Sequence, residues 1–206
     1  MPAIKQAVLI GCGMVSSAYM DAFSHLQDRV RLKGVMASTP GSAQAFIDRQ
    51  TEPLASDLNV YQNTAAIAGD DEVDFVILAT PPNARLDICR PLAEAGMPVL
   101  MEKPVERTAQ AARQLVDLFA EHHLPLGLVL QHRARASAQK LANLLAGGGA
   151  GALRSVEITV PWWRPQSYYD VDGRGSYDRD GGGVLISQAI HTLDLALQFT
   201  GPVSSV

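Results

Sequence analysis

Residues 1–131 alternate between short apolar runs of strand length and longer segments in which apolar residues recur at helical spacing. The run from Val73 to Ala79 is apolar throughout, which is typical of a parallel strand buried on both faces. Strands that alternate with helices predict an α/β domain, a doubly wound parallel sheet with helices on both faces. Strands are expected at residues 3–10, 31–37, 60, 73–79, 99–102 and 126–131, and helices at 14–24, 40–50, 64–68, 84–95 and 109–122.

Residues 132–206 follow a different pattern, so a domain boundary is expected near residue 131. A helix is expected over 137–146, an alternating strand over 153–160 and an amphipathic helix over 184–199. The segment from Pro161 to Gly183 is aromatic and glycine-rich without periodicity, and loops of this length are usually functional or disordered. These residues predict the start of an α+β domain.

Composition narrows the class of protein. With 47% hydrophobic residues in 206, the chain can bury one large core or two modest ones. The net charge is -4 and the short basic run His132 to Arg135 contains no aromatic residue, which argues against nucleic-acid binding. Membrane-length apolar runs and a secretory signal are absent, and Cys12 and Cys89 fall in unrelated contexts. We expect a soluble, cytoplasmic protein with free thiols.

The turn Gly11-Cys12-Gly13 follows the first strand and opens the first helix. In that context a G-x-G-x-x-G pattern predicts a Rossmann-type dinucleotide site, although a plain strand-to-helix turn is the alternative. The first glycine permits the tight turn, and the second lets the backbone approach a pyrophosphate at the helix N-terminus. Ser16 stands in place of the third glycine and is still small. The expected cofactor is NAD or NADP, bound here by Gly11, Gly13, Met14 and Val15.

The end of the second strand bears on the choice of cofactor. An NAD site usually has an Asp or Glu about 20 residues after the glycines. Here Ser38 and Thr39 occupy the strand end, without a carboxylate or an arginine. Their hydroxyls suit either a ribose hydroxyl or a 2′-phosphate, so the choice stays open and leans slightly to NADP.

Two further strand ends carry candidate residues, because ligands bind at the carboxyl ends of strands in open α/β sheets. Thr80-Pro81-Pro82-Asn83 suits a wall over a flat cofactor, or is simply a rigid turn. Lys103 precedes a proline, which favours extended geometry and a projecting ammonium that can bind an anion or a hydroxyl or move protons. The alternative is a surface lysine that closes a strand. The cofactor-binding residues expected at these ends are Thr80, Pro81, Asn83, Glu102 and Lys103.

The helix over 184–199 places Ser187, His191 and Asp194 at spacings i, i+4 and i+7, on one face. A lone histidine on an apolar helix is more often a core residue than a catalyst, but this one has possible orienting partners. In the loop before the helix, Trp163-Arg164 and Tyr168 suit stacking on a sugar, or form an interface patch.

Together these segments resemble the Gfo/Idh/MocA family, named for glucose–fructose oxidoreductase, inositol dehydrogenase and a rhizopine-catabolism protein. The resemblance implies an NAD(P)-dependent oxidoreductase that moves hydride between nicotinamide and a sugar, cyclitol or related polyol. It assigns catalysis to Lys103 and His191, on opposite sides of a domain cleft, and we expect a homo-oligomer. The matching segments are Gly11-Cys12-Gly13, Thr80-Pro81-Pro82, Glu102-Lys103-Pro104, Trp163-Arg164, Gly181-Gly182-Gly183 and His191-Thr192-Leu193-Asp194. The expected substrate-binding residues are Trp163, Arg164, Tyr168, Ser187, His191 and Asp194.

Three features depart from the family pattern. Ser187 stands where many members carry an aspartate, and Arg85 where many carry a histidine. Family chains also continue beyond the point that corresponds to Val206, so the second domain, residues 132–206, is expected to be truncated. The alternatives are a dinucleotide-binding protein without catalysis and a homo-oligomeric scaffold that uses the aromatic loop as its interface.

Overall fold

The computed structural model describes residues 3–50 and 57–205. The chain divides into two compact units, Met1–Leu128 and Val129–Val206. Residues 51–56, between the two described ranges, lie outside the described part. Within the described residues, no helix is both long and apolar enough to pass through a membrane.

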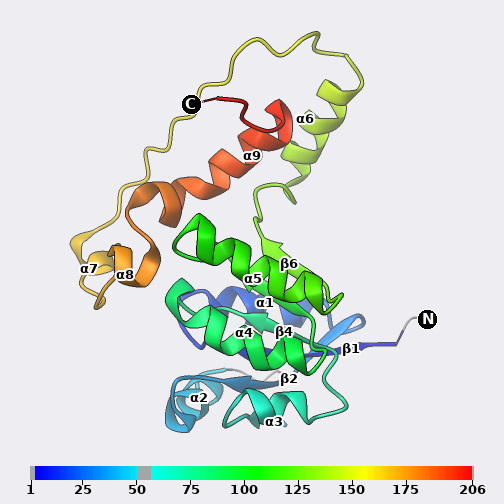
Figure 1. The fold of residues 1–206 in the computed structure, drawn as a ribbon, viewed down its shortest axis with the longest axis vertical. Helices are drawn as coiled ribbons and strands as arrows, with labels where there is room; N and C mark the ends of the chain where they lie inside the picture. The colour runs from blue at the N-terminus through cyan, green and yellow to red at the C-terminus, as the bar shows by residue number, and fades with distance from the viewer. Residues whose placement is uncertain (1–2, 51–56, 206) are drawn as a thin grey trace. The chain divides into compact units, whose positions relative to one another are not determined.

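The first unit is built on a six-stranded sheet in the order β3-β2-β1-β4-β5-β6 (Figure 1). All pairs from β3 to β5 in this order are parallel. Strands β2 and β3 lie on one side of β1, and strands β4 to β6 lie on the other, so the topological switch point is between β1 and β4. Doubly wound sheets bind ligands at this point, beyond the carboxyl ends of their strands. The predicted α/β class is therefore confirmed. The strands are β1 (Lys5–Ile10), β2 (Val30–Met36), β3 (Asn59–Val60), β4 (Phe75–Leu78), β5 (Val99–Glu102) and β6 (Leu126–Val129).

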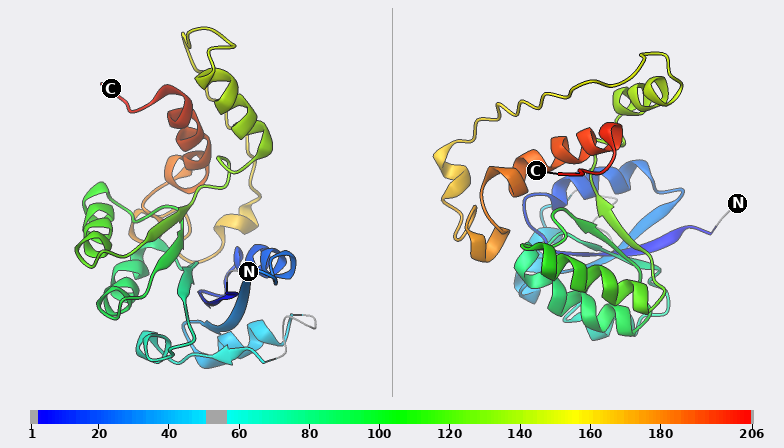
Figure 2. Two further views of the ribbon diagram at one scale, coloured as in Figure 1. Left: turned by 90° about the vertical axis from the view of Figure 1, so that its right-hand side faces the viewer. Right: turned by 45° about the horizontal axis from the view of Figure 1, so that its top comes forward.

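Helices cover both faces of this sheet (Figure 2). Alternate residues of a strand point to opposite faces. Accordingly, Val8 and Ile10 of β1 pack in one cluster with residues of α3, α4 and α5. Ala7 and Leu9 pack in a second cluster with residues of α1 and α2. The helices are α1 (Ser16–His25), α2 (Pro40–Ile47), α3 (Thr64–Ala68), the 3-10 turn η1 (Pro82–Ala84), α4 (Arg85–Glu94) and α5 (Ala109–Glu121).

The register of the strands aligns their carboxyl ends. Ile10 of β1 pairs with Met36 of β2 on one side and Leu78 of β4 on the other, and Leu78 pairs with Met101 of β5. The segments that follow β1, β2, β4 and β5 therefore begin at one edge of the sheet. The predicted cofactor-binding residues lie in these four segments, except Glu102, which is the last residue of β5.

The second unit is helical in its described residues. It contains α6 (Ala136–Ala146), α7 (Gln166–Tyr169), α8 (Tyr177–Asp180), the π-helical segment η2 (Leu185–Ala189) and α9 (Ile190–Thr200). The strand predicted over 153–160 is wrong, because these residues form neither strand nor helix. An alternating pattern becomes a strand only where a neighbouring strand supplies hydrogen bonds, and residues 130–205 contain none.

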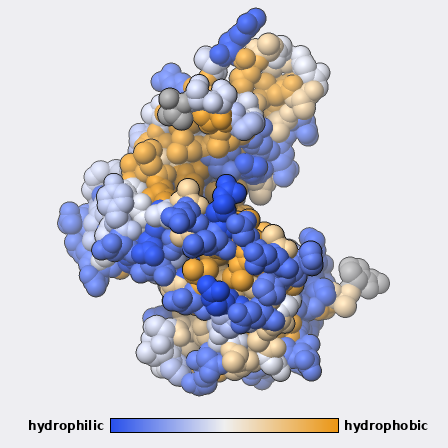
Figure 3. All heavy atoms as spheres, viewed as in Figure 1, coloured by the Kyte–Doolittle hydropathy of each residue, from blue (hydrophilic) through white to orange (hydrophobic). Residues whose placement is uncertain are grey.

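Apolar side chains stay exposed on the second unit, and Figure 3 shows them as an orange surface around α9. They come from α6, from the extended segment 153–160, from α9 and from the end of the chain. Exposed apolar surface of this kind marks interaction sites when it is contiguous. The exposed residues are Leu141, Leu144, Leu153, Val156, Ile158, Leu193, Leu197 and Val203.

The helix predicted over 184–199 is present, but it begins as a π-helix. Ser187 lies in η2, whereas His191 and Asp194 lie in α9. The α-helical spacing that predicts one shared face therefore does not relate Ser187 to His191. Single π-turns in helices are rare and frequently occur at functional sites.

Candidate functional site

The turn after β1 leaves its second glycine open. Gly11 has a φ of +101°, and a Cβ there would lie 2.8 Å from the carbonyl carbon of Ala79, so only glycine fits between the ends of β1 and β4. At Gly13 a Cβ would meet nothing within 4 Å. Met14 is 66% exposed. Backbone in this turn is thus open to close approach by a ligand.

The N-terminus of α1 lacks the side-chain cap that α2, α3 and α5 have. Thr39, Asn63 and Thr108 cap α2, α3 and α5 by accepting a hydrogen bond from a backbone N–H in the first turn. The corresponding residue of α1, Val15, gives no such bond, and the first turn of α1 contains no acidic residue. A helix N-terminus of this kind favours an anionic group such as a pyrophosphate.

The end of β2 gives its two hydroxyl residues different surroundings. Thr39 is committed to α2: its Oγ1 accepts from the backbone N–H of Ser42 at 3.1 Å and lies 2.8 Å from the Ser42 hydroxyl. Ser38 is exposed. Of the two predicted ribose contacts, Ser38 therefore has the more available hydroxyl, and the choice between NAD and NADP stays open.

A buried arginine joins the segments that follow β4 and β5. The Arg85 side chain is 1% exposed, and its Nε and Nη2 donate to the carbonyl of Thr80 at 3.2 and 2.9 Å. Its Nη1 donates to the carbonyls of Glu102 and Pro104. Burial lowers the pKa of Arg85 to about 10, against the opposing effect of Glu102, so it is charged at neutral pH. Arg85 therefore fixes the backbone on both sides of Lys103.

The carboxylate of Glu102 connects this edge to α1. Glu102 is 9% exposed, and its Oε1 accepts from the hydroxyl of Tyr19 at 2.8 Å. Burial and the Glu102 charge raise the pKa of Tyr19, so the phenol keeps the proton that it donates. The helix that begins at the glycine turn is thus hydrogen-bonded to the residue before Lys103.

The other predicted residues of the first unit lie beside these. Lys103 is half-buried, and its peptide bond to Pro104 is cis. Pro81 precedes η1, and Asn83 is exposed within it. Among the described residues, the buried Oγ1 of Thr80 has no hydrogen-bond partner. A buried hydroxyl without a partner is uncommon in native structures, and a bound molecule could satisfy it.

The thiols are not candidate nucleophiles. Both cysteines are free, as expected. Burial raises the pKa of Cys12 to about 11 and that of Cys89 to about 12. The thiolate is the reactive form of cysteine, so neither side chain is activated at neutral pH. The described residues also contain no group of three or more His, Cys, Asp or Glu that could hold a metal ion.

In the second unit, His191 lies against another histidine. His191 is 5% exposed and His132 6%, and their ring centroids are 5.1 Å apart with the planes tilted by 37°. His132 also meets Trp162 edge-on at 6.1 Å. Burial, and secondarily the charge of Arg135, lower the pKa of His132. The sequence pattern shows His132 only as part of a short basic run, so this neighbour was missed.

Asp194 and Ser187 have defined partners. The Asp194 carboxylate forms a two-pronged ion pair with Arg133, with Nε–Oδ2 at 2.6 Å and Nη2–Oδ1 at 2.5 Å. This pair ties α9 to the segment that follows β6. The Ser187 hydroxyl donates to the carbonyl of Gly183 at 2.8 Å. Asp194 thus joins α9 to Arg133, and Ser187 bonds to the residue that precedes the helix start.

In the loop before η2, Trp163 is 79% exposed, and Trp162 is the tryptophan that contacts His132. The guanidinium carbon of Arg164 lies 5.8 Å from the Trp162 ring and 5.2 Å from the Tyr168 ring. Arg174 approaches the same Tyr168 ring at 4.6 Å. Arg164 and Tyr168 are thus together, whereas Trp163 stands apart from the ring contacts of the described residues.

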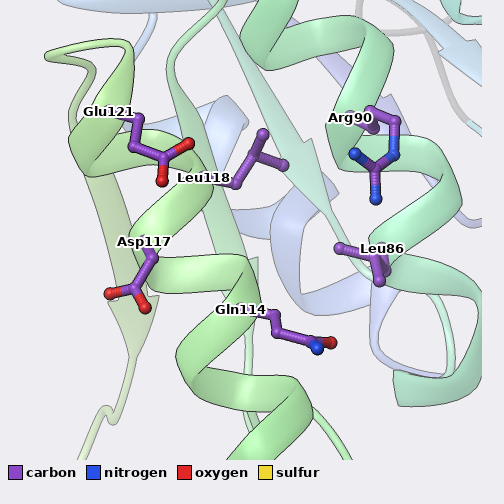
Figure 4. A pocket seen from close by; sticks show the side chains of 6 residues that line it. All are labelled: Leu86, Arg90, Gln114, Asp117, Leu118 and Glu121. Atoms are coloured by element: carbon purple, nitrogen blue, oxygen red, sulfur yellow. The ribbon is translucent and has the colours of Figure 1, made fainter.

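A separate cavity of about 370 Å³ opens between α4 and α5 of the first unit (Figure 4). Figure 4 shows side chains of both helices around it, with charged groups on each helix. None of the predicted site residues lines it. Its lining residues are Leu86, Arg90, Gln114, Asp117, Leu118 and Glu121.

Two family models match the two units of the chain separately. Residues 5–129 match a family model described as an oxidoreductase family with an NAD-binding Rossmann fold. Residues 138–206 match the GFO/IDH/MocA C-terminal domain. The chain is 30% identical over 158 residues to the rhizopine catabolism protein MocA of Rhizobium meliloti, covering 73% of this chain and 48% of that protein.

Two further relatives cover nearly the whole chain. Inositol 2-dehydrogenase of Rhizobium meliloti (strain 1021) is 26% identical over 198 residues, which are 95% of this chain and 56% of that protein. The WlbA dehydrogenase from Bordetella pertussis, solved in complex with NADH and UDP-GlcNAcA, is 28% identical with a TM-score of 0.88. That match covers 98% of this chain and 57% of the WlbA chain. The chain thus spans about half the length of the relatives that it matches.

Proposed function

The chain belongs to the Gfo/Idh/MocA family of oxidoreductases, and on that basis we propose that it is an NAD(P)-dependent oxidoreductase. Its substrate is a secondary alcohol or ketone of a sugar, cyclitol or related polyol. The observation that carries the proposal is the alignment of the glycine turn, the Thr80 loop and Glu102-Lys103 at one edge of the sheet. The relatives named inositol 2-dehydrogenase and WlbA dehydrogenase support the substrate class.

The residues at this edge fit a dinucleotide. Gly13 leaves open space beside the backbone, and α1 begins without a capping side chain or an acidic group. The turn formed by Gly11, Gly13, Met14 and Val15 would hold the pyrophosphate, and Ser38 would contact the ribose on the adenine side. Thr80, Pro81, Asn83 and Glu102 would hold the nicotinamide, which would supply the hydride acceptor or donor.

Lys103 and His191 have complementary roles in this proposal. The Lys103 ammonium donates a hydrogen bond to the reacting oxygen of the substrate, which stabilises negative charge on that oxygen during the reaction. The His191 imidazole accepts the hydroxyl proton during oxidation and returns it during reduction. Arg85 and Tyr19 position Lys103 indirectly, through the residue before it. Arg85 bonds to the carbonyl of Glu102, and Tyr19 bonds to its carboxylate. The ion pair between Asp194 and Arg133 holds α9, the helix that carries His191.

The test separates cofactor binding from turnover. NADH and NADPH are titrated by nucleotide fluorescence, and turnover is measured over a panel of sugars and cyclitols. We expect Lys103→Met to bind the cofactor nearly as well as the wild type and to lose turnover by about 10²–10⁴-fold. Lys140→Met, which changes an exposed lysine of α6, serves as the matched control and keeps both properties.

Unchanged turnover in Lys103→Met would contradict the assignment. Cofactor binding without turnover over the whole panel would favour a dinucleotide-binding protein that is not an enzyme. The expected homo-oligomer stays a prediction, and light scattering on the purified chain checks it.

A further inference from the structure

Two arginines approach one tyrosine ring in the loop before η2. The guanidinium carbons of Arg164 and Arg174 lie 5.2 and 4.6 Å from the centroid of Tyr168. A guanidinium that stacks on an aromatic ring keeps the N–H donors at its edge available for a carboxylate or a phosphate. Two such groups around one ring therefore form a double cation whose N–H donors are available.

The local sequence explains how Arg174 reaches this position. It lies between Gly173 and Gly175, whose φ angles are +69° and +79°. Left-handed backbone on both sides of one residue reverses the chain, and glycine adopts it without steric cost. The turn therefore returns Arg174 to a tyrosine that lies six positions earlier in the chain.

Two carboxylates of the same loop are bonded to other groups. Asp180 accepts from the backbone N–H of Gly175 at 2.8 Å and pairs with Arg179, and Asp170 accepts from Gln166 at 3.2 Å. Across the described residues, neither Arg164 nor Arg174 takes part in an ion pair. Like charges repel, and an anion bound to both guanidinium groups would offset that repulsion.

The same contacts lead to the histidine that we assign to proton exchange. Arg164 lies 5.8 Å from the ring of Trp162, Trp162 meets His132 at 6.1 Å, and His132 lies 5.1 Å from His191. A hydrogen bond between the buried Gln188 of η2 and the Tyr169 hydroxyl, at 3.4 Å, also holds the loop to the helix that carries His191. The double cation is thus part of one connected group of side chains that ends at His191.

We propose that Arg164 and Arg174, arranged around Tyr168, form a subsite for an anionic group of the substrate. The substrate is then an acidic sugar, one that carries a carboxylate or a phosphate, and not a neutral polyol. This inference rests on the proposed function, because it concerns the substrate of that same site.

The test compares sugars that differ in the group at C6, which is neutral in glucose and anionic in the other two. Glucose, glucuronate and glucose 6-phosphate are titrated calorimetrically into the chain saturated with NADH. The variants are Arg164→Gln, Arg174→Gln and the double variant, with Arg154→Gln, an exposed arginine of the same unit, as the matched control. Because the arginines concerned are exposed or half-exposed, the variants are expected to fold, which circular dichroism checks.

We expect at least one anionic sugar to bind about tenfold or more tightly than glucose, with the preference weakened by salt. The double variant should lose this preference and Arg154→Gln should keep it. Preference for glucuronate identifies a carboxylate, and preference for glucose 6-phosphate identifies a phosphate. A lack of preference for either anionic sugar, or a preference that survives the double variant, would overturn the inference. Failure to bind NADH in the prior titration would instead refute the proposed function.

Discussion

Replacement of Arg85 by methionine should destabilise the first unit at one defined place. The guanidinium supplies hydrogen bonds to the carbonyls of Thr80, Glu102 and Pro104. A buried carbonyl left without a donor costs about 1–3 kcal/mol, so three of them cost about 3 kcal/mol at the lower limit. Methionine keeps an apolar stem and removes the cost of burying a charge, which offsets part of the loss. We expect the free energy of unfolding to fall by about 2–3 kcal/mol, which leaves a domain of ordinary stability folded.

Urea unfolding followed by circular dichroism measures the loss, and hydrogen–deuterium exchange locates it. Exchange should accelerate in peptides that contain residues 79–84 and 102–106, and stay unchanged in the peptide that contains β2. Arg85→Lys should be intermediate, because one ammonium cannot reach all three carbonyls with the geometry of a guanidinium. Arg90→Met changes an exposed arginine one turn further along α4, and should shift stability by no more than about 0.5 kcal/mol.

Two results would contradict this role of Arg85. If Arg85→Met unfolds at the same urea concentration as Arg90→Met and the two segments exchange at wild-type rates, the guanidinium does not hold the strand ends together. A loss of stability with faster exchange spread evenly over the first unit would also contradict a local positioning role.

Three further predictions concern single contacts. Tyr19→Phe removes the hydroxyl that donates to Glu102 and should lower the free energy of unfolding by about 1–2 kcal/mol in urea titrations; an unchanged value would mean that this bond contributes nothing. Asp194→Asn breaks the pair with Arg133 and should destabilise the second unit by about 1–2 kcal/mol, measured by the fluorescence of Trp162 and Trp163, both in that unit; Asp172→Asn, at an exposed carboxylate, is the control. Burial lowers the pKa of His132 below its ordinary 6.5, so the unfolded chain takes up a proton first and stability should fall as the pH drops through 6.5. His132→Asn should flatten that dependence, and equal slopes in the two proteins would contradict it.

The sequence predicted the first unit well, because its signals are local. The expected strand over 99–102 and the expected helix over 64–68 are confirmed as β5 and α3 with the same bounds. The order of the segments then requires a parallel sheet, and a parallel sheet brings its carboxyl ends to one edge. The clustering of the glycine turn, the Thr80 loop and Lys103 follows from these steps alone.

What the sequence could not predict depends on partners that are distant along the chain. In the sequence, Arg85 is only a charged residue at the start of a predicted helix. In the structure, its guanidinium donates to the carbonyls of Glu102 and Pro104, which lie 17 and 19 residues away. The ion pair of Asp194 with Arg133, 61 residues earlier, likewise has no signal in the spacing along the helix. The alternating pattern over 153–160 tells which side chains share a face but not whether another strand pairs with them. The π-helical start of the last helix has no signal in residue spacing.

The most direct test of the central proposal is the affinity for NADH of Gly13→Ala. A Cβ at Gly13 meets no protein atom within 4 Å, so this substitution should leave the fold and its urea midpoint unchanged. Gly41→Ala, in α2, has equally open surroundings and is the matched control. If a dinucleotide lies against the turn after β1, Gly13→Ala should bind NADH about tenfold or more weakly than the wild type, and Gly41→Ala should bind it equally well. Wild-type affinity in Gly13→Ala would contradict a cofactor site at this turn.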